Sequence, residues 1–300
     1  MIHDRSHIDT EKFNPDSAQL DALPVLDAVR LMNQEDQRAV AAVGQQADTI
    51  ARAVELVASA FCSGGRLIYV GAGTSGRLGV LDAAECPPTF STDPGMVIGI
   101  IAGGSAAIQR SIENVEDDSE AGARALRDIH IGNHDVVVGI AAGGTTPFVH
   151  GAIAEARTCG AKTIFLACTR REHITTDADM FICIETGPEI LTGSTRLKAG
   201  TATKLVLNTI STLAMTRIGK VYGNIMVDVD CLKNSKLIDR AVRIIMRITG
   251  INRTDATELL QQSRGNVKRA VVMRVRHCDA ATADQLLTAS EGQLRQIIGT

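Results

Sequence analysis

The stretch Arg66-Leu-Ile-Tyr-Val-Gly-Ala-Gly-Thr-Ser-Gly-Arg-Leu78 decides the fold of this chain. Its first part, residues 66–70, is a short apolar run rich in β-forming residues, and it predicts a buried strand. The glycines Gly71, Gly73 and Gly76 then fall at a strand-to-helix turn. Such a turn leaves backbone N–H groups unpaired at a helix N-terminus, where the helix dipole favours an anion.

The chemistry of this turn favours a phosphate group. Thr74 and Ser75 add two hydroxyl donors to the glycines. A glycine-rich loop with hydroxyls but without a Gly-Lys-Ser/Thr ending fits a phosphate monoester better than a nucleoside triphosphate. The glycines also match the GxGxxG pattern of dinucleotide sites, but no acidic residue follows at the required distance. Phosphate binding is therefore the favoured interpretation, ahead of a plain tight turn and a dinucleotide site.

Four further apolar runs follow the first one: residues 96–101, 135–140, 162–167 and 180–184. The spacing leaves room for a helix between consecutive runs. Near-continuous apolar strands alternating with helices predict an α/β fold with a doubly wound, five-stranded parallel sheet. Ligands bind such sheets at the carboxyl ends of the strands. Gly104 and Ser105 follow the second strand, and Gly144 and Thr146 follow the third. If the first and third loops flank the switch in strand order, they would form a two-sided phosphate cradle.

We divide the chain into three parts, which are an N-terminal arm with helices, a sheet domain that carries the glycine-rich loop and a small helical domain: residues 1–62, 63–234 and 235–300. Residues 1–20 are polar and typical of a frayed terminus. Two helices should follow before residue 62, with a break near residues 33–36. Residues 105–129 should form one connecting helix. Three helices are expected after residue 235, and their basic residues lack the stacking aromatics of an RNA-binding surface.

Composition sets broad limits on the class of protein. The 300 residues are 45% hydrophobic, enough for a full core, and the formal net charge of −3 favours neither nucleic acid nor an anionic membrane as a partner. No apolar run reaches the roughly 18 residues that a membrane span needs. The seven cysteines form no CxxC pair, which is typical of reduced thiols in the cytoplasm. His3 and His7 have helical spacing but no third ligand nearby, so we expect no metal site.

Hydroxyl and cationic residues follow the last strand and lead into a long helix that should end near Tyr222. Ser194, Thr195, Arg196 and Lys198 stand at the expected start of this helix. They could contact a ligand there, or they could cap a solvated helix terminus. The residues alone leave both interpretations open.

Several long motifs of the chain resemble those of the N-acetylmuramic acid 6-phosphate etherases. They are Gly71–Pro88 (GAGTSGRLGVLDAAECPP), Asn114–Asp117 (NVED), Gly187–Lys198 (GPEILTGSTRLK) and Tyr222–Val229 (YGNIMVDV). That family belongs to the sugar isomerase (SIS) phosphosugar-binding superfamily and is related to the glucokinase regulatory protein. The resemblance covers nearly the whole chain. It implies a cytoplasmic homodimer that acts on a small phosphosugar without a cofactor, and a C-terminal domain similar to ubiquitin-associated three-helix domains.

The resemblance also implies a reaction. It is the cleavage of the D-lactyl ether of N-acetylmuramic acid 6-phosphate to N-acetylglucosamine 6-phosphate and D-lactate, a step of peptidoglycan recycling. A base removes the C2 proton of the open-chain aldehyde, an acid protonates the departing ether oxygen, and water then adds at C3. This lyase chemistry needs two carboxyl groups in opposite protonation states.

Glu85 and Glu116 match the catalytic pair of the family, with Glu85 as proton donor and Glu116 as base. The acidic residues Asp117, Asp118 and Glu120 would instead favour the protonated form of Glu116, which suits an acid. Without the resemblance, both would be read as ordinary surface glutamates. Since each follows the loop of a predicted strand, we expect both to lie on the ligand side of the sheet.

The chain departs from the family pattern at two places. Gly143 and Thr145 replace a serine and an arginine in the third loop, which removes one hydroxyl and one cation from the expected phosphate cradle. Ser235 stands where the family commonly has glutamate. Two other functions therefore stay in view: an aldose–ketose phosphosugar isomerase, which would yield a ketose, and a non-catalytic phosphosugar sensor. The paired glutamates favour catalysis.

Overall fold

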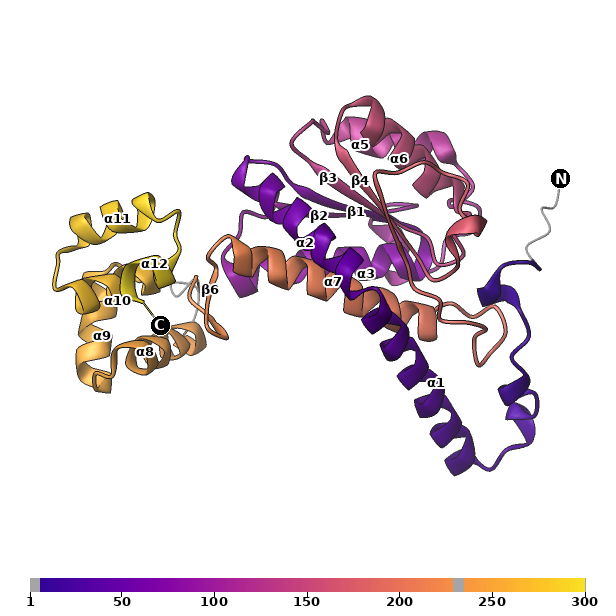
Figure 1. Cartoon of the computed structure of the whole chain (residues 1–300), viewed down its shortest axis with the longest axis horizontal. Coiled ribbons are helices and arrows are strands. Elements are labelled where there is room, and N and C mark those ends of the chain that lie inside the picture. Colours follow the sequence, from indigo (N-terminus) through magenta and orange to yellow (C-terminus); the bar gives the residue numbers. More distant parts are fainter. Residues whose placement is uncertain (1–5, 229–234, 300) are drawn as a thin grey trace. The chain divides into compact units, whose positions relative to one another are not determined.

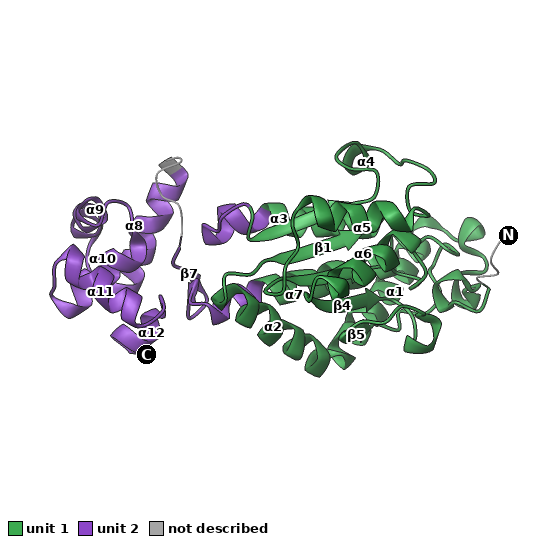
Figure 2. Ribbon diagram, turned by 90° about the horizontal axis from the view of Figure 1, so that it is seen from above, with its two compact units in different colours: residues 1–84, 95–211 green, residues 85–94, 212–300 purple. Residues whose placement is uncertain are grey.

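A computed structural model describes residues 6–228 and 235–299 of the chain. It divides into two compact units, coloured separately in Figure 2. The first unit comprises residues 1–84 and 95–211, and the second comprises residues 85–94 and 212–300. The domain boundaries expected at 62/63 and 234/235 stay predictions, and residue 234 lies outside the described ranges.

The first unit is built on a parallel sheet of five strands (Figure 1): β1 (Leu67–Gly71), β2 (Val97–Ile101), β3 (Val136–Ile140), β4 (Lys162–Ala167) and β5 (Met180–Cys183). The strand order is β2-β1-β3-β4-β5, and every neighbouring pair is parallel. This confirms the predicted α/β fold with a five-stranded parallel sheet. The winding reverses between β1 and β3, so the first and third loops do flank the switch point, where such sheets bind ligands.

Helices cover both faces of this sheet (Figure 1). On one face lie α5 (Ser119–Asp128) and α6 (Pro147–Thr158), which pack closely on each other. The other face carries α2 (Ala47–Cys62) and the first part of α7 (Lys198–Arg217). Because both faces are covered, every residue of β1 and β3 is buried, which explains why those strands read as unbroken apolar runs.

Glycines allow helix α3 (Gly73–Phe90) to lie directly against β1. A Cβ atom on Gly71 would lie 2.7 Å from the backbone nitrogen of Gly76, and one on Gly79 would lie 2.8 Å from Cβ of Tyr69. Later residues of the helix therefore approach earlier residues of the strand, so α3 runs back along β1. Its glycines are required by close packing as well as by the turn.

The break between the N-terminal helices is not where the sequence predicts it. Helix α1 (Val25–Gln45) runs through residues 33–36, and the chain leaves helical geometry only at Gln46, before α2. The polar run looks like a solvated loop in sequence, but Glu35 is 1% exposed and paired inside the unit. A tertiary contact thus overrides the local signal.

The segment expected to be one helix over residues 105–129 is also divided. It contains the short helix α4 (Ala106–Gln109) and helix α5, joined by residues 110–118. Asn114 adopts a positive φ of 64° in this connection, and the Asp118 side chain accepts a hydrogen bond from the backbone nitrogen of Ala121 at 2.8 Å. That N-cap begins α5, so Glu116 lies in a loop and not in a helix.

Within its described residues, the second unit contains the ends of α3 and α7, a short hairpin and five helices, where three helices were expected after residue 235: β6 (Val221–Tyr222), β7 (Ile225–Met226), α8 (Ser235–Thr249), α9 (Arg253–Gln262), α10 (Val267–Arg276), α11 (Ala280–Ala289) and α12 (Leu294–Ile298). Helix α7 ends at Arg217, earlier than the predicted Tyr222. Side-chain N-caps at Asn252, Asn266 and Asp279 each begin a new helix. These caps divide the helical pattern more finely than its apolar periodicity shows.

Other properties of the described residues bear on the class of protein. None of their helices combines the length and the apolar character needed to cross a bilayer. Six of the cysteines are free thiols, while Cys231 lies outside the described ranges. Within residues 6–228 and 235–299, no cluster of three or more His, Cys, Asp or Glu side chains is arranged to hold a metal ion.

Candidate active site

The loops after β1 and β3 line a cavity of about 220 Å³, which we name the hydroxyl-rich cavity. Five hydroxyl side chains line it: Thr74, Ser75, Thr145, Thr146 and Thr195. The rest of its wall is formed by Ile8, Glu11, Ala72, Gly73, Glu116, Ala142, Gly143 and Pro147. No Lys or Arg is among these lining residues. An anion in this cavity would therefore be held by hydroxyls, backbone N–H groups and the N-terminus of α3.

A second cavity, of about 340 Å³, adjoins the first, and we name it the Arg77 cavity. Its wall is formed by Ala72, Gly73, Arg77, Ala102, Ala107, Ser111, Ile112, Glu113, Asn114, Val115, Glu116 and Asp117. The two cavities share three residues, which are Ala72, Gly73 and Glu116. One carboxylate therefore stands where two chemically different spaces meet.

Backbone contacts hold Glu116 at this junction. The carbonyl oxygen of Glu116 accepts a hydrogen bond of 3.0 Å from the backbone nitrogen of Phe148, in the first turn of α6. The third loop leads directly into that turn, and the carbonyl of Gly144 within it accepts a hydrogen bond of 2.8 Å from Nε2 of His150. Both loops are therefore tied to the start of α6. The Glu116 side chain itself is exposed to solvent.

The N-terminal arm forms part of the site, although the sequence predicted a frayed terminus. Ile8 and Thr10 are fully buried, and Ile8 and Glu11 line the hydroxyl-rich cavity. A Cβ atom added to Gly143 would meet Ile8 Cγ2 at 3.6 Å, an ordinary contact distance. The arm thus packs beside the altered third loop. The apolar Ile8 was the only sequence signal for this contact, and a single apolar residue is too weak to predict burial.

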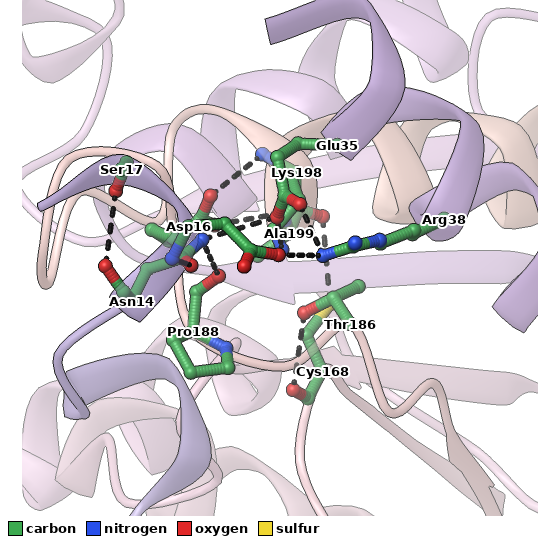
Figure 3. A network of polar contacts seen from close by, with 11 residues as sticks. Asn14, Asp16, Ser17, Glu35, Arg38, Cys168, Thr186, Pro188, Lys198 and Ala199 are labelled. Atoms are coloured by element: carbon green, nitrogen blue, oxygen red, sulfur yellow. Dashed lines mark hydrogen bonds and ion pairs between the residues drawn. The ribbon is translucent and has the colours of Figure 1, made fainter. Parts of the chain in front are cut away.

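Lys198 does not reach either cavity, because it is paired in the interior of the first unit (Figure 3). Its ammonium lies 2.5 Å from Oε2 of Glu35, and the two side chains are 3% and 1% exposed. Asn14 donates a hydrogen bond of 3.1 Å to the same carboxylate oxygen, and Arg38 contacts the other oxygen. The network joins the N-terminal arm, α1 and the start of α7 through one buried carboxylate.

A second buried carboxylate caps helix α7. Glu189 accepts hydrogen bonds of 2.9 Å from the backbone nitrogens of both Lys198 and Ala199. Burial raises the pKa of Glu189, and the two backbone hydrogen bonds oppose that rise. Thr195, which lines the hydroxyl-rich cavity, lies three residues before the first capped nitrogen.

The structure brings together only part of the predicted site. The following predicted residues line the hydroxyl-rich cavity: Gly73, Thr74, Ser75, Glu116, Thr146 and Thr195. The following predicted residues line neither cavity: Gly104, Ser105, Gly144, Ser194, Arg196 and Lys198. Arg77 was not predicted as a site residue, although it is the first cation after the glycine-rich loop.

Glu85 belongs to the second unit and lies farther along helix α3 than the cavity-lining residues Gly73 to Arg77. It lies twelve residues after Gly73 in α3, which corresponds to about 18 Å along the helix at roughly 1.5 Å per residue. Glu85 is exposed, and it lines neither cavity. Of the two glutamates expected on the ligand side of the sheet, Glu116 lines both cavities and Glu85 lines neither.

Comparisons with known proteins identify the fold of the first unit. Residues 49–157 match the family model described as glucokinase regulatory protein N-terminal SIS domain. A phosphoheptose isomerase from Francisella tularensis shares the fold, with a TM-score of 0.51 and 16% identity over 65% of this chain and 100% of that one.

Two full-length relatives are much more similar. N-acetylmuramic acid 6-phosphate etherase of Gloeobacter violaceus is 56% identical over 293 residues, which are 98% of this chain and 95% of that protein. The etherase of Rippkaea orientalis is 53% identical over 298 residues, with 99% and 97% covered. Identity at this level over the whole length, together with the SIS fold, means that the chain belongs to the N-acetylmuramic acid 6-phosphate etherase family.

Proposed function

We propose that this chain is a carbon–oxygen lyase that cleaves the D-lactyl ether of N-acetylmuramic acid 6-phosphate. The products are N-acetylglucosamine 6-phosphate and D-lactate, formed by elimination and subsequent addition of water, in the cytoplasm. Full-length identity above 50% to etherases carries this proposal. A carboxylate at the junction of two cavities supports it.

The hydroxyl-rich cavity suits the phosphate group of this substrate. Thr74 and Ser75 stand in the first turn of α3, where backbone N–H groups and the helix dipole favour an anion. Thr145, Thr146 and Thr195 supply further hydroxyls from the opposite side. The cation missing from the third loop is therefore not essential, since neutral donors can hold a phosphate monoester.

In this proposal, Glu116 acts as the base of the elimination. With the phosphate in the hydroxyl-rich cavity, the sugar chain extends toward the junction, and Glu116 removes the C2 proton made acidic by the open-chain aldehyde. General base catalysis requires the carboxylate within hydrogen-bond reach of that proton. The exposed Glu116 side chain can reorient toward a bound substrate.

We propose that Glu85 of a second copy of the chain supplies the acid. Helix α3 carries Glu85 about 18 Å from Gly73, too far to protonate an ether oxygen beside Glu116 of the same chain. Leu81, one helical turn before Glu85, is 52% exposed, and helix α1 exposes Val25, Leu26 and Val29 at 57% or more. Exposed apolar residues of this kind mark an interface, so a homodimer would cover them and bring Glu85 to the site.

The reaction is tested by incubating the purified protein with N-acetylmuramic acid 6-phosphate and measuring D-lactate with a coupled dehydrogenase. Glu85→Ala and Glu116→Ala should each lower turnover by about 10²- to 10⁴-fold or more, the usual worth of a general acid or base. A ketose product without lactate would instead support an aldose–ketose isomerase. Saturable binding without turnover would support a sensor.

The shared site is tested by co-expressing the two inactive variants with different affinity tags. A dimer of one Glu85→Ala chain and one Glu116→Ala chain has one site with both glutamates intact, if each site combines two chains. Random assembly should then restore about a quarter of wild-type activity. Isolated mixed dimers that stay inactive would show that the two glutamates act within one chain.

A further inference from the structure

The Arg77 cavity differs chemically from the hydroxyl-rich cavity. Apolar side chains form part of its wall, beside polar and charged ones: Ala72, Ala102, Ala107, Ile112 and Val115. Among its lining residues, Arg77 is the only cation. A cation beside an apolar wall fits a small organic anion that carries an alkyl group.

The Arg77 guanidinium is held by backbone carbonyls of the neighbouring loop. Its Nε donates to the carbonyl of Ile108 at 3.1 Å, and its Nη2 donates to the carbonyl of Arg110 at 3.2 Å. A guanidinium has more N–H donors than these two bonds use. Across the described part of the chain, no carboxylate forms an ion pair with Arg77. Arg77 is therefore an oriented cation with free donors and, among residues 6–228 and 235–299, no anionic partner.

The arrangement of the cavities matches a ligand with an anion at each end. Glu116, together with Ala72 and Gly73, lies in the wall of both cavities. The proposed substrate carries a phosphate at C6 and a lactyl carboxylate on the C3 ether, with the reacting C2–C3 bond between them. Phosphate in the hydroxyl-rich cavity and C2 at Glu116 would direct the lactyl group into the Arg77 cavity.

We propose that Arg77 binds the carboxylate of the lactyl group and that the apolar wall contacts its methyl group. This inference rests on the proposed etherase function. Arginine and a carboxylate form two parallel hydrogen bonds in a fixed geometry, which would orient the departing ether oxygen as well as select the substrate. Arg77 is thus a specificity-determining residue.

Two other carboxylates line the same cavity and bear on its charge. Glu113 and Asp117 are exposed to solvent, so their repulsion of a bound anion is weakened by water and salt. They oppose any anion that lacks a paired cation. The contact with Arg77 is therefore what makes the cavity acceptable to a carboxylate.

The test compares two substrates in wild-type protein and in Arg77→Gln. The first is N-acetylmuramic acid 6-phosphate, and the second is its lactyl carboxamide, which has the same size without the charge. Wild-type protein should prefer the acid by about 10- to 100-fold in kcat/KM, as expected for a charge-assisted pair. Arg77→Gln should lose most of that preference, because its turnover of the acid falls while its turnover of the carboxamide changes little.

Three controls separate recognition from general damage. Arg110→Gln removes an exposed cation of the same loop that does not line the cavity, and it should keep the wild-type preference. Binding of N-acetylglucosamine 6-phosphate, which lacks the lactyl group, should be unchanged in Arg77→Gln. Arg77→Lys keeps the charge without the paired geometry, and it should show an intermediate preference.

The possible outcomes are distinct. If the wild-type protein releases no D-lactate from the acid, the proposed etherase function fails. If it does release lactate, and Arg77→Gln loses activity equally on acid and carboxamide, the assignment of Arg77 is overturned. An unchanged acid preference in Arg77→Gln would overturn it as well.

Discussion

Replacing Lys198 with methionine tests whether this residue is a structural partner of Glu35 or a ligand for phosphate. The ammonium and the carboxylate are 2.5 Å apart, and their side chains are 3% and 1% exposed. Lys198→Met keeps a long apolar stem but leaves the Glu35 carboxylate buried without this cation. Uncompensated buried charge is among the few causes of large destabilisation by a single substitution.

The size of the effect follows from what remains around Glu35. Breaking a buried ion pair by removing one partner costs about 3–5 kcal/mol. Asn14 and Arg38 still contact the carboxylate, so we expect the lower end, about 3 kcal/mol. At about 2–4 °C per kcal/mol for a domain of this size, the Tm should fall by about 6–12 °C.

Differential scanning calorimetry of the full chain measures this change. A matched control is Arg30→Met, which breaks the exposed pair of Arg30 with Asp27 and should cost about 0–1 kcal/mol. The double variant Glu35→Gln/Lys198→Met removes both charges and should recover most of the lost stability. A Lys198→Met protein with an unchanged Tm and a raised KM for the phosphosugar would refute the reasoning and make Lys198 a ligand contact.

Three further predictions follow from other contacts. The pKa of Asp135 is lowered on folding, because burial, which would raise it, is outweighed by hydrogen bonds from Arg66 and from the backbone of Gly132. The ionised carboxylate therefore stabilises the fold above about pH 4, and this stabilisation is lost as the pH falls further. Urea unfolding should show that Asp135→Asn lowers the free energy of unfolding at pH 7 and much less near pH 3. Gly76→Ala would place a Cβ 2.7 Å from a backbone oxygen and should lower the Tm, whereas Gly44→Ala meets nothing within 4 Å and should raise it slightly. Burial raises the pKa of the Cys168 thiol to about 12, so mass spectrometry after iodoacetamide treatment at pH 8 should find it unmodified while exposed thiols react.

The sheet could be predicted from the sequence because its signals are local. Strands buried on both faces read as continuous apolar runs, and the glycine-rich turn after the first run marks the start of a helix wherever the rest of the chain lies. The same locality explains why Thr74, Ser75 and Thr146 could be expected at one edge of the sheet, where they line one cavity. Each follows directly from a strand end, and parallel strands bring their carboxyl ends to one edge.

Helix boundaries were less predictable where distant residues decide them. The polar residues near Glu35 predicted a break in α1. The helix continues because Lys198, 163 residues away in the sequence, pairs with the Glu35 carboxylate. The connection between β2 and β3 reads as one helix, but the Asp118 cap divides it. Helical periodicity reports which face is apolar, and it does not report which polar residue will find a buried partner.

The sequence by itself determined the fold class and the family, because these depend on residues that are neighbours along the chain. Only the tertiary structure decided which candidates share a site. It placed Glu116 between two cavities, buried Lys198 against Glu35 and carried Glu85 away along α3. The physical reason is that a site is defined by distances through space. Those distances depend on how helices pack on the sheet, and no local pattern records that packing.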